Sequence, residues 1–263
     1  MPQSEKSVIE AHAYPSEEKV SILEVQKLSK SFGGVNAIFD LDLDVKEGEI
    51  LGLIGPNGSG KTTFFNLVSG LLKPDRGEIR FQNKKITGLT PDKICLAGVA
   101  RTFQIVKPFF RMSPLENIMV GRAYGGTSPA RNREEARRDA EQILAFTGLA
   151  GKKAPRAGML NLNDRKRLEI ARALATRPKL LLLDEVMAGL NTAEIEEAMR
   201  FVKEIREANI TIIMVEHVMK AVLGISDRVV VLNVGEKIAE GTPDEIASNQ
   251  KVIDAYLGEE MYA

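Results

Sequence analysis

Short apolar segments recur along the chain and define its expected elements. Residues 38–45 alternate apolar and polar side chains with a period of two, which predicts a half-buried strand. Residues 49–54 form an apolar strand that leads directly into glycines. Farther along, β-rich runs at 179–184, 210–215 and 228–233 are separated by segments of helix length. Because this alternation is typical of parallel strands joined by crossover helices, it predicts an α/β fold.

The middle of the chain predicts helices. Residues 131–147 form a charged amphipathic pattern, and residues 165–176 form another. Two later helix starts carry capping-box patterns, Asn191 with Glu194 and Thr242-Pro243 with Glu245.

The first 20 residues show no sustained periodicity, so we expect a mobile leader. No basic region precedes an apolar run there, which argues against a secretory signal. The longest apolar stretches, such as 180–183 and 212–215, are far below the roughly 18 residues that span a bilayer. The lone Cys95 fits a reducing compartment. We therefore expect a cytoplasmic protein.

The overall charge attracts no particular class of partner. Lys and Arg together number 36, Asp and Glu also number 36, and 44% of the residues are hydrophobic, enough for a substantial core. With no net charge, the chain has no general attraction for nucleic acid or an anionic membrane. Binding must therefore depend on a local site.

Residues 55–62 carry the strongest chemical signal. They read Gly55-Pro56-Asn57-Gly58-Ser59-Gly60-Lys61-Thr62 and match G-x-x-x-x-G-K-[ST] between a strand and a helical segment that starts at Thr63. The glycines let backbone N–H groups surround phosphates, Lys61 supplies a cation, and the Thr62 hydroxyl suits Mg²⁺. The alternative is an ordinary glycine-rich turn with a solvated lysine. We expect residues 55–63 to bind a nucleotide's phosphates with Mg²⁺.

Two carboxylates end a second apolar strand. We expect Asp184 to hold Mg²⁺, directly or through water, and Glu185 to orient or deprotonate the attacking water. His217 follows the strand at 212–215, at the edge where open α/β sheets bind ligands, so we expect it to contact the terminal phosphate. A surface or core imidazole without that role is the alternative for His217.

Together these motifs resemble those of the nucleotide-binding subunits of ATP-binding cassette (ABC) transporters, over roughly residues 22–257. The resemblance implies that Phe32 stacks on adenine and that Gln104 approaches magnesium from its loop. It also implies that residues 188–191 touch a second subunit and that His217 is the switch histidine. For Phe32, a core aromatic beside a turn is the alternative.

The resemblance implies a fold and a reaction. The fold is α/β: a P-loop NTPase core with a mainly parallel sheet, an antiparallel β subdomain and an inserted α-helical subdomain. The expected segments are a flexible leader (1–20), a nucleotide-binding core with the β subdomain (21–103), a helical subdomain with a degenerate signature (104–176), and the rest of the core with the carboxylates, the histidine and C-terminal helices (177–263). The expected cofactors are ATP and Mg²⁺, and the expected reaction is ATP hydrolysis coupled to transmembrane transport.

Four segments are similar, more narrowly, to the branched-chain (hydrophobic) amino acid importer group, LivG-type: 101–104, 115–121, 167–174 and 252–258. This similarity implies a pair of ATPase subunits, identical or different, beneath two transmembrane permease subunits, with a solute-binding protein that delivers the substrate. It implies a peripheral location on the inner face of the cell membrane. Export remains the alternative direction, because the motor motifs are shared.

The family signature, usually Leu-Ser-Gly-Gly-Gln, departs from its pattern here. Its four variant residues are Asn161, Leu162, Asn163 and Asp164, after Leu160. In the family this segment contacts the γ-phosphate held by the opposite subunit. Asn161 suits a helix cap and Asn163 tolerates left-handed backbone, but the Asp164 carboxylate would repel a phosphate if it faced one. We therefore hypothesise an asymmetric dimer, in which the site with this chain's Lys61 and Glu185 is the better catalyst.

Residues 105–112 form an apolar and aromatic stretch with cations at its rims. If exposed, this stretch suits a helix of the membrane subunit; alternatively, Phe109 and Phe110 fill the core of the helical subdomain. We interpret residues 131–141 as a solvated helix face.

Two rival functions fit the nucleotide-binding motifs less well than a transporter does. An ABC ATPase of DNA maintenance or translation would need no membrane partner, but the short separation of Lys61 from Leu160 leaves no room for a long coiled coil, and the neutral charge disfavours nucleic acid. A nucleotide-binding protein without hydrolysis would lack the catalytic carboxylate, whereas Glu185 is present.

Overall fold

The computed structural model describes residues 20–104, 107–151 and 156–260. The expected mobile leader, apart from Val20, lies outside the described residues. The same holds for Ile105 and Val106 of the apolar stretch.

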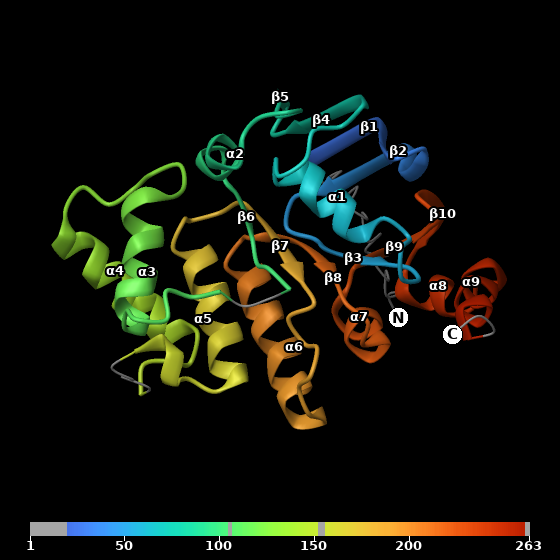
Figure 1. Cartoon of the computed structure of the whole chain (residues 1–263). Helices are drawn as coiled ribbons and strands as arrows, with labels where there is room; N and C mark the ends of the chain where they lie inside the picture. Colours follow the sequence, from blue (N-terminus) through green and yellow to red (C-terminus); the bar gives the residue numbers. More distant parts are fainter. Residues whose placement is uncertain (1–19, 105–106, 152–155, 261–263) are drawn as a thin grey trace, which may run out of the picture.

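Two sheets form the framework (Figure 1). The first is antiparallel, in the order β2-β1-β4-β5, and consists of β1 (Ser21–Phe32), β2 (Val35–Lys46), β4 (Arg76–Phe81) and β5 (Lys84–Lys85). The second has the order β10-β9-β3-β8-β7-β6 and consists of β3 (Ile50–Ile54), β6 (Val99–Arg101), β7 (Leu180–Asp184), β8 (Thr211–Val215), β9 (Arg228–Asn233) and β10 (Glu236–Gly241). Only β10 joins the second sheet antiparallel; the other neighbours are parallel. The predicted α/β class, with its antiparallel sheet, is confirmed.

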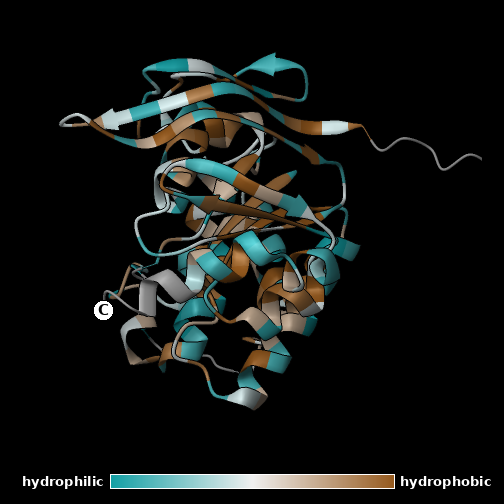
Figure 2. Ribbon diagram, turned by 90° about the vertical axis from the view of Figure 1, so that its right-hand side faces the viewer, coloured by the Kyte–Doolittle hydropathy of each residue, from teal (hydrophilic) through white to brown (hydrophobic). Residues whose placement is uncertain are grey.

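The second sheet is covered on both faces, which explains its continuous apolar strands. Every residue of β3, β7 and β8 is buried. Leu180 and Leu182 belong to the hydrophobic cluster around helix α1 (Lys61–Val68) and the antiparallel sheet, whereas Leu181 and Leu183 belong to the cluster that contains residues of the later helices. Figure 2 shows these hydrophobic strands inside a more hydrophilic exterior.

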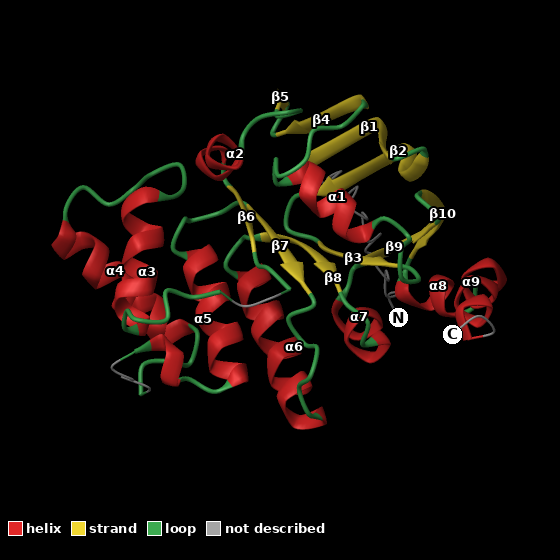
Figure 3. Cartoon of the chain, in the orientation of Figure 1, coloured by secondary structure: helices red, strands yellow, loops and turns green. Residues whose placement is uncertain are grey.

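The helices lie mainly on one side of the second sheet (Figure 3). They are α1 (Lys61–Val68), α2 (Pro91–Ala97), α3 (Pro114–Tyr124), α4 (Arg133–Phe146), α5 (Leu162–Leu174), α6 (Thr192–Glu207), α7 (Met219–Ile225), α8 (Pro243–Ala247) and α9 (Gln250–Glu260), with a 3₁₀ turn at Ala157–Met159. Both predicted capping boxes form, at the starts of α6 and α8. Helices α3, α4 and α5 share a third hydrophobic cluster of their own. Every helix in the described part of the chain is too short or too polar to span a bilayer.

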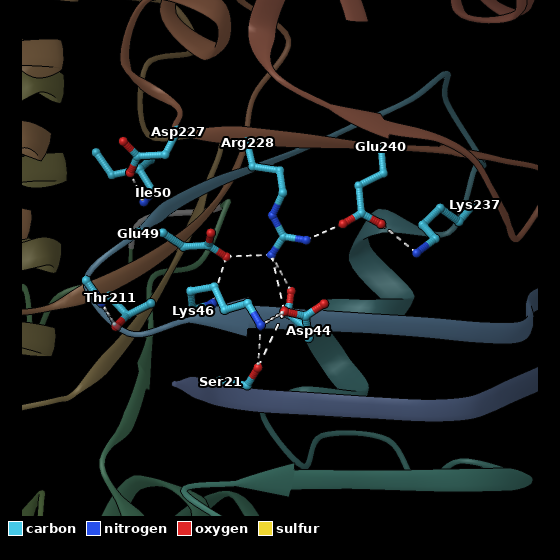
Figure 4. A network of polar contacts seen from close by, with 11 residues as sticks. Ser21, Asp44, Lys46, Glu49, Ile50, Thr211, Asp227, Arg228, Lys237 and Glu240 are labelled. Atoms are coloured by element: carbon cyan, nitrogen blue, oxygen red, sulfur yellow. Dashed lines mark hydrogen bonds and ion pairs between the residues drawn. The ribbon is translucent and has the colours of Figure 1, made fainter. Parts of the chain in front are cut away.

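A polar network joins the two sheets (Figure 4). Arg228 of β9 donates to the Asp44 carbonyl oxygen of β2 (2.6 Å) and to Glu49 Oε1 (2.7 Å), and it pairs with Glu240 of β10. Because the Arg228 side chain is only 20% exposed, these contacts form in a partly desolvated environment. The network therefore fixes the antiparallel sheet relative to the strands that carry the site.

Candidate active site

The turn between β3 and α1 is held close to its neighbours. A Cβ atom on Gly55 would lie 2.0 Å from the Leu232 carbonyl oxygen, and one on Gly60 would lie 2.4 Å from the Ala37 carbonyl oxygen. Both glycines have positive φ, 147° and 109°. Only glycine meets both requirements, so the predicted loop has the tight backbone that phosphate binding needs.

The Lys61 ammonium lies inside this turn. Its Nζ donates to the carbonyl oxygens of Gly55 (2.6 Å) and Pro56 (2.8 Å), and the residue is 6% exposed. Lys61 is also the first residue of α1, whose N-terminal N–H groups favour anions. The local structure thus concentrates positive charge at the predicted phosphate position.

Several predicted site residues line one hollow of ≈ 250 Å³. It is bounded by Ala37, Asn57, Gly58, Ser59, Gly60, Lys61, Thr62, Thr63, Gln104, Glu185 and His217. These residues come from β2, the turn and start of α1, and the segments that follow β6, β7 and β8. The fold therefore brings Gln104, Glu185 and His217 together beside the turn that precedes α1.

Glu185 is held from two sides. Gln104 Nε2 donates to Glu185 Oε2 at 2.8 Å, and His217 Nε2 lies 3.0 Å from Glu185 Oε1. The Glu185 backbone has φ 50°, a left-handed conformation that is uncommon for a non-glycine residue, and its N–H donates to the Val215 carbonyl oxygen. This sharp turn at the end of β7 directs the carboxylate into the hollow.

Asp184 makes a buried ion pair that the motifs did not predict. Arg101 Nη2 lies 2.8 Å from Asp184 Oδ2, with side-chain exposures of 7% and 4%. The Asp184 backbone N–H donates to the Thr102 hydroxyl at 3.0 Å. The sign of this ion pair in the sequence is a charged residue, Arg101, within the mainly apolar segment that precedes Gln104.

The loop after Glu185 depends on two more residues that sequence reasoning missed. Glu216 Oε1 accepts from the Met187 backbone N–H at 2.7 Å, and Lys166 Nζ donates to the Ala188 carbonyl oxygen. Burial raises the pKa of Glu216 to about 7, against opposing effects from Met187 and Lys166. Burial likewise lowers the pKa of Lys166. The sequence places Glu216 directly between the apolar strand 212–215 and His217, and no motif marks it.

The oxygen atoms near the hollow fit Mg²⁺. The Thr62 hydroxyl, the Asp184 carboxylate and the Gln104 carbonyl are hard oxygen ligands, which this ion prefers. Across the described segments, no group of three or more His, Cys, Asp or Glu residues is arranged to hold a metal. A set with a single carboxylate, Asp184, suits an ion that binds through one or two carboxylates plus phosphates and water.

Other predicted residues lie away from the hollow. Phe32 does not line it. The residue is 46% exposed and is therefore not a core aromatic, and Lys30 Nζ lies 5.4 Å from its ring centroid. Asn161 caps α5 by accepting from the Asp164 N–H at 2.8 Å. Asp164 is only 4% exposed, and Asn163 has helical rather than left-handed backbone. Thus Asp164 does not present its carboxylate on the surface, and Leu162 (52% exposed) does present its side chain there.

A second hollow, a groove of ≈ 320 Å³, lies between the core and the group of helices α3, α4 and α5. It is lined by residues of α2, β6, α3 and α5, among them Arg101, Phe103, Glu169 and Arg172. Glu169 Oε1 accepts from the Phe103 N–H at 2.7 Å, and burial raises the pKa of Glu169. Near this groove, Phe109 is 43% exposed, and its ring centroid lies 4.6 Å from the Arg172 guanidinium. Phe110 is 47% exposed, so neither aromatic is a buried core residue.

Comparisons with known proteins agree with this geometry. A family model described as ABC transporter matches residues 38–188, and one described as branched-chain amino acid ATP-binding cassette transporter matches residues 236–262. The chain is 42% identical over 250 residues to the "High-affinity branched-chain amino acid transport ATP-binding protein BraF" of Pseudomonas aeruginosa and to its LivG counterpart of Salmonella typhimurium, in each case over 90% of this chain and 98% of the relative.

Solved structures show the same likeness. An ATP-binding cassette of an ABC transporter in its ADP conformation has a TM-score of 0.83 and 34% identity, over 91% of this chain and 99% of that one. A dimeric cassette in a post-hydrolysis state, bound to ADP and Pi, has a TM-score of 0.75 and 27% identity, over 84% and 98%. The chain therefore belongs to the ABC transporter ATPases, in the group that contains the LivG and BraF ATP-binding proteins.

Proposed function

We propose that this chain binds MgATP in the 250 Å³ hollow, hydrolyses it, and thereby powers the import of branched-chain or other hydrophobic amino acids. The observation that carries the proposal is the position of Glu185. Its carboxylate lines the same hollow as Lys61 and is held by Gln104 and His217. A nucleotide-binding protein without hydrolysis would have no use for a base so placed.

Each residue of the hollow has a distinct role in this mechanism. The backbone N–H groups of residues 57–62 and the Lys61 ammonium bind the β- and γ-phosphates. Thr62, Asp184 and Gln104 hold Mg²⁺, which when bound offsets the phosphate charge. Glu185 orients and deprotonates the attacking water, and His217 contacts the γ-phosphate. Phe32 stacks on the adenine ring, for which its exposed face is suited.

The signature segment supports pairing with a different ATPase subunit. The asparagine at 163 cannot supply the close, side-chain-free backbone approach of a glycine, and the exposed Leu162 offers no polar group to a phosphate. The site formed by this segment and a partner's phosphate loop is therefore the weaker catalyst. The burial of Asp164 removes the repulsion expected from its carboxylate, so the weakness comes from missing donors rather than from charge.

The 320 Å³ groove is the docking place for a helix of the membrane subunit. Its apolar lining and the nearby exposed Phe109 and Phe110 suit an amphipathic helix, and Arg172 supplies a cation at its edge. The chain then lies on the inner face of the membrane, paired with a second cassette beneath two permease subunits. A solute-binding protein delivers the amino acid to those permeases.

Reconstitution of the whole transporter tests the proposal. The chain is expressed with the membrane proteins that co-purify with it, inserted into vesicles with ATP on the side of the ATPases, and assayed for uptake of radiolabelled leucine. We expect ATP-dependent uptake, which Lys61→Ala abolishes by removing the phosphate-binding cation. Co-purification of soluble DNA or ribosome factors in place of membrane proteins would favour the rival clamp ATPase, and ATP-driven efflux would favour an exporter.

A further inference from the structure

The Arg101 guanidinium contacts the Asp184 carboxylate directly, and both side chains are buried. We propose that Arg101 is the resident counter-ion of Asp184: a positioning residue that neutralises this buried carboxylate while no Mg²⁺ is bound. The inference rests on the proposed function, because it takes Asp184 as a Mg²⁺ ligand.

Both members of the Arg101–Asp184 pair are buried. A buried carboxylate without a counter-charge is strongly unfavourable, so the site needs a cation in every state in which Asp184 is ionised. The Arg101 contact is to Oδ2 at 2.8 Å, and a carboxylate has a second oxygen with which to ligand a metal ion. Arg101 therefore supplies the charge between turnovers without occupying the whole carboxylate.

The rest of the Arg101 guanidinium is attached to the helix of the phosphate loop. Nη1 donates to Asn66 Oδ1 at 2.6 Å and to the Ser69 hydroxyl at 3.2 Å, both in or directly after α1. The guanidinium also lies 5.4 Å from the ring centroids of Phe65 and Phe103. Because α1 begins with Lys61 and Thr62, Arg101 links the two halves of the metal site.

The arrangement has a cost that packing alone does not explain. Arg101 Nε is buried and has no hydrogen-bond partner among the described residues. An unsatisfied buried donor is unfavourable, and an apolar side chain would fill the same space without it. A requirement for positive charge beside Asp184 accounts for the arginine.

Arg101 also lines the 320 Å³ groove, so a helix bound there lies beside the residue that contacts Asp184.

Thermal unfolding of the purified chain tests the inference without any measurement of turnover. The melting temperature (Tm) is compared for wild type, Arg101→Met and Arg101→Lys, each without ligand, with ADP and EDTA, and with ADP and Mg²⁺. In Arg101→Met we expect the Mg²⁺-dependent rise in Tm to exceed that of wild type by about 4 °C, because the metal replaces the lost charge. The rise with ADP and EDTA stays unchanged, since the phosphate loop is intact. Arg101→Lys keeps a cation beside Asp184, so we expect its Mg²⁺-dependent rise in Tm to equal that of wild type.

A Mg²⁺-dependent rise in Arg101→Met that equals or falls below that of wild type overturns the inference, because a merely structural role lowers all Tm values together. If Arg101→Met does not fold, Arg101→Gln takes its place; it keeps an amide donor, lacks the charge, and carries the same expectation. If wild type itself shows no Mg²⁺-dependent rise, the proposed Mg²⁺ site fails instead, so the two failures are distinguishable.

Discussion

His217 Nε2 lies 3.0 Å from Glu185 Oε1 although the two residues belong to the ends of different strands. Gln104 occupies the other oxygen of the same carboxylate at 2.8 Å. Both Glu185 oxygens therefore have partners in this state, and each still has a lone pair with which to accept from a water molecule. Gln104 and His217 thus fix the direction of the carboxylate and leave it able to accept further hydrogen bonds.

Glu185→Gln should reduce turnover by about 100-fold or more while preserving nucleotide binding, because an amide cannot accept the proton of water. Phosphate release and equilibrium binding of a fluorescent ATP analogue measure the two quantities separately. The exposed Glu204→Gln serves as the control and should leave both unchanged. Equal loss of binding and turnover in Glu185→Gln would show that the residue only maintains the fold.

The asymmetry of the signature predicts unequal effects in the assembled dimer. Glu185→Gln in this chain should remove most of the ATPase activity of the complex, whereas the matching change in a partner subunit should remove a minor part. Under the proposed asymmetry, the partner's glutamate works with this chain's signature, whose exposed Leu162 offers no polar group to a phosphate. The measurement is the initial rate of ATP hydrolysis by each of the two complexes that carry a single change. Equal losses of ATPase activity would contradict the asymmetry.

Gly55→Ala and Gly58→Ala form a matched pair in the phosphate loop. The new methyl group at Gly55 would lie 2.0 Å from the Leu232 carbonyl oxygen, whereas at Gly58 it meets nothing within 4 Å. We expect Gly58→Ala to cost about 1–2 kcal/mol, from its positive φ alone. Gly55→Ala should cost considerably more and distort nucleotide binding. Urea unfolding measures the loss of stability, and ADP titration measures the loss of binding. Equal stabilities of the two variants would argue against the close approach of Gly55 to the Leu232 carbonyl oxygen in β9.

Glu216→Gln should change how stability depends on pH. Burial raises the pKa of Glu216 from 4.5 to about 7, so the folded state binds more protons than the unfolded state between these values. Wild type therefore loses stability as pH rises through this window, by as much as about 3 kcal/mol, whereas the Gln variant lacks this contribution. The facing charged groups, Lys166 and Glu185, are present in both proteins.

Urea unfolding at pH 5 and pH 8 provides the comparison for Glu216, with the exposed Glu204→Gln as a control that keeps the wild-type pH dependence. The free energy of unfolding of Glu216→Gln, relative to that of wild type, should be higher at pH 8 than at pH 5. A difference independent of pH would mean that Glu216 titrates at its ordinary pKa.

Arg228→Met should destabilise the junction of the two sheets by about 2–4 kcal/mol, because it leaves the carboxylates of Glu49 and Glu240 without their shared cation. The control is Arg137→Met, which removes an exposed pair with Glu141 in α4 and should cost less than about 0.5 kcal/mol. Chemical unfolding of both variants gives the two values. Similar values would mean that the Arg228 network is as weak as a surface ion pair.

Much of the fold could be predicted because its signals are local. The phosphate loop is contiguous from Gly55 to Thr62, and the capping box of α6 needs only Asn191 and Glu194. Helix α5 nevertheless begins earlier than its apolar periodicity indicated, at Leu162, because Asn161 supplies the cap. Such local rules concern only neighbours along the chain, so they can be applied without knowledge of the tertiary structure.

The sequence by itself determined the α/β class, the phosphate loop, and Glu185, Gln104 and His217 as candidates for its chemistry. Only the tertiary structure decided that Arg101 contacts Asp184, that Glu216 is buried against the loop after Glu185, and that Asp164 is hidden from the surface. The partners Arg101 and Asp184 are 83 positions apart along the chain. Burial and charge pairing between such distant residues arise from the packing of strands and helices, and no local pattern of residue types encodes them.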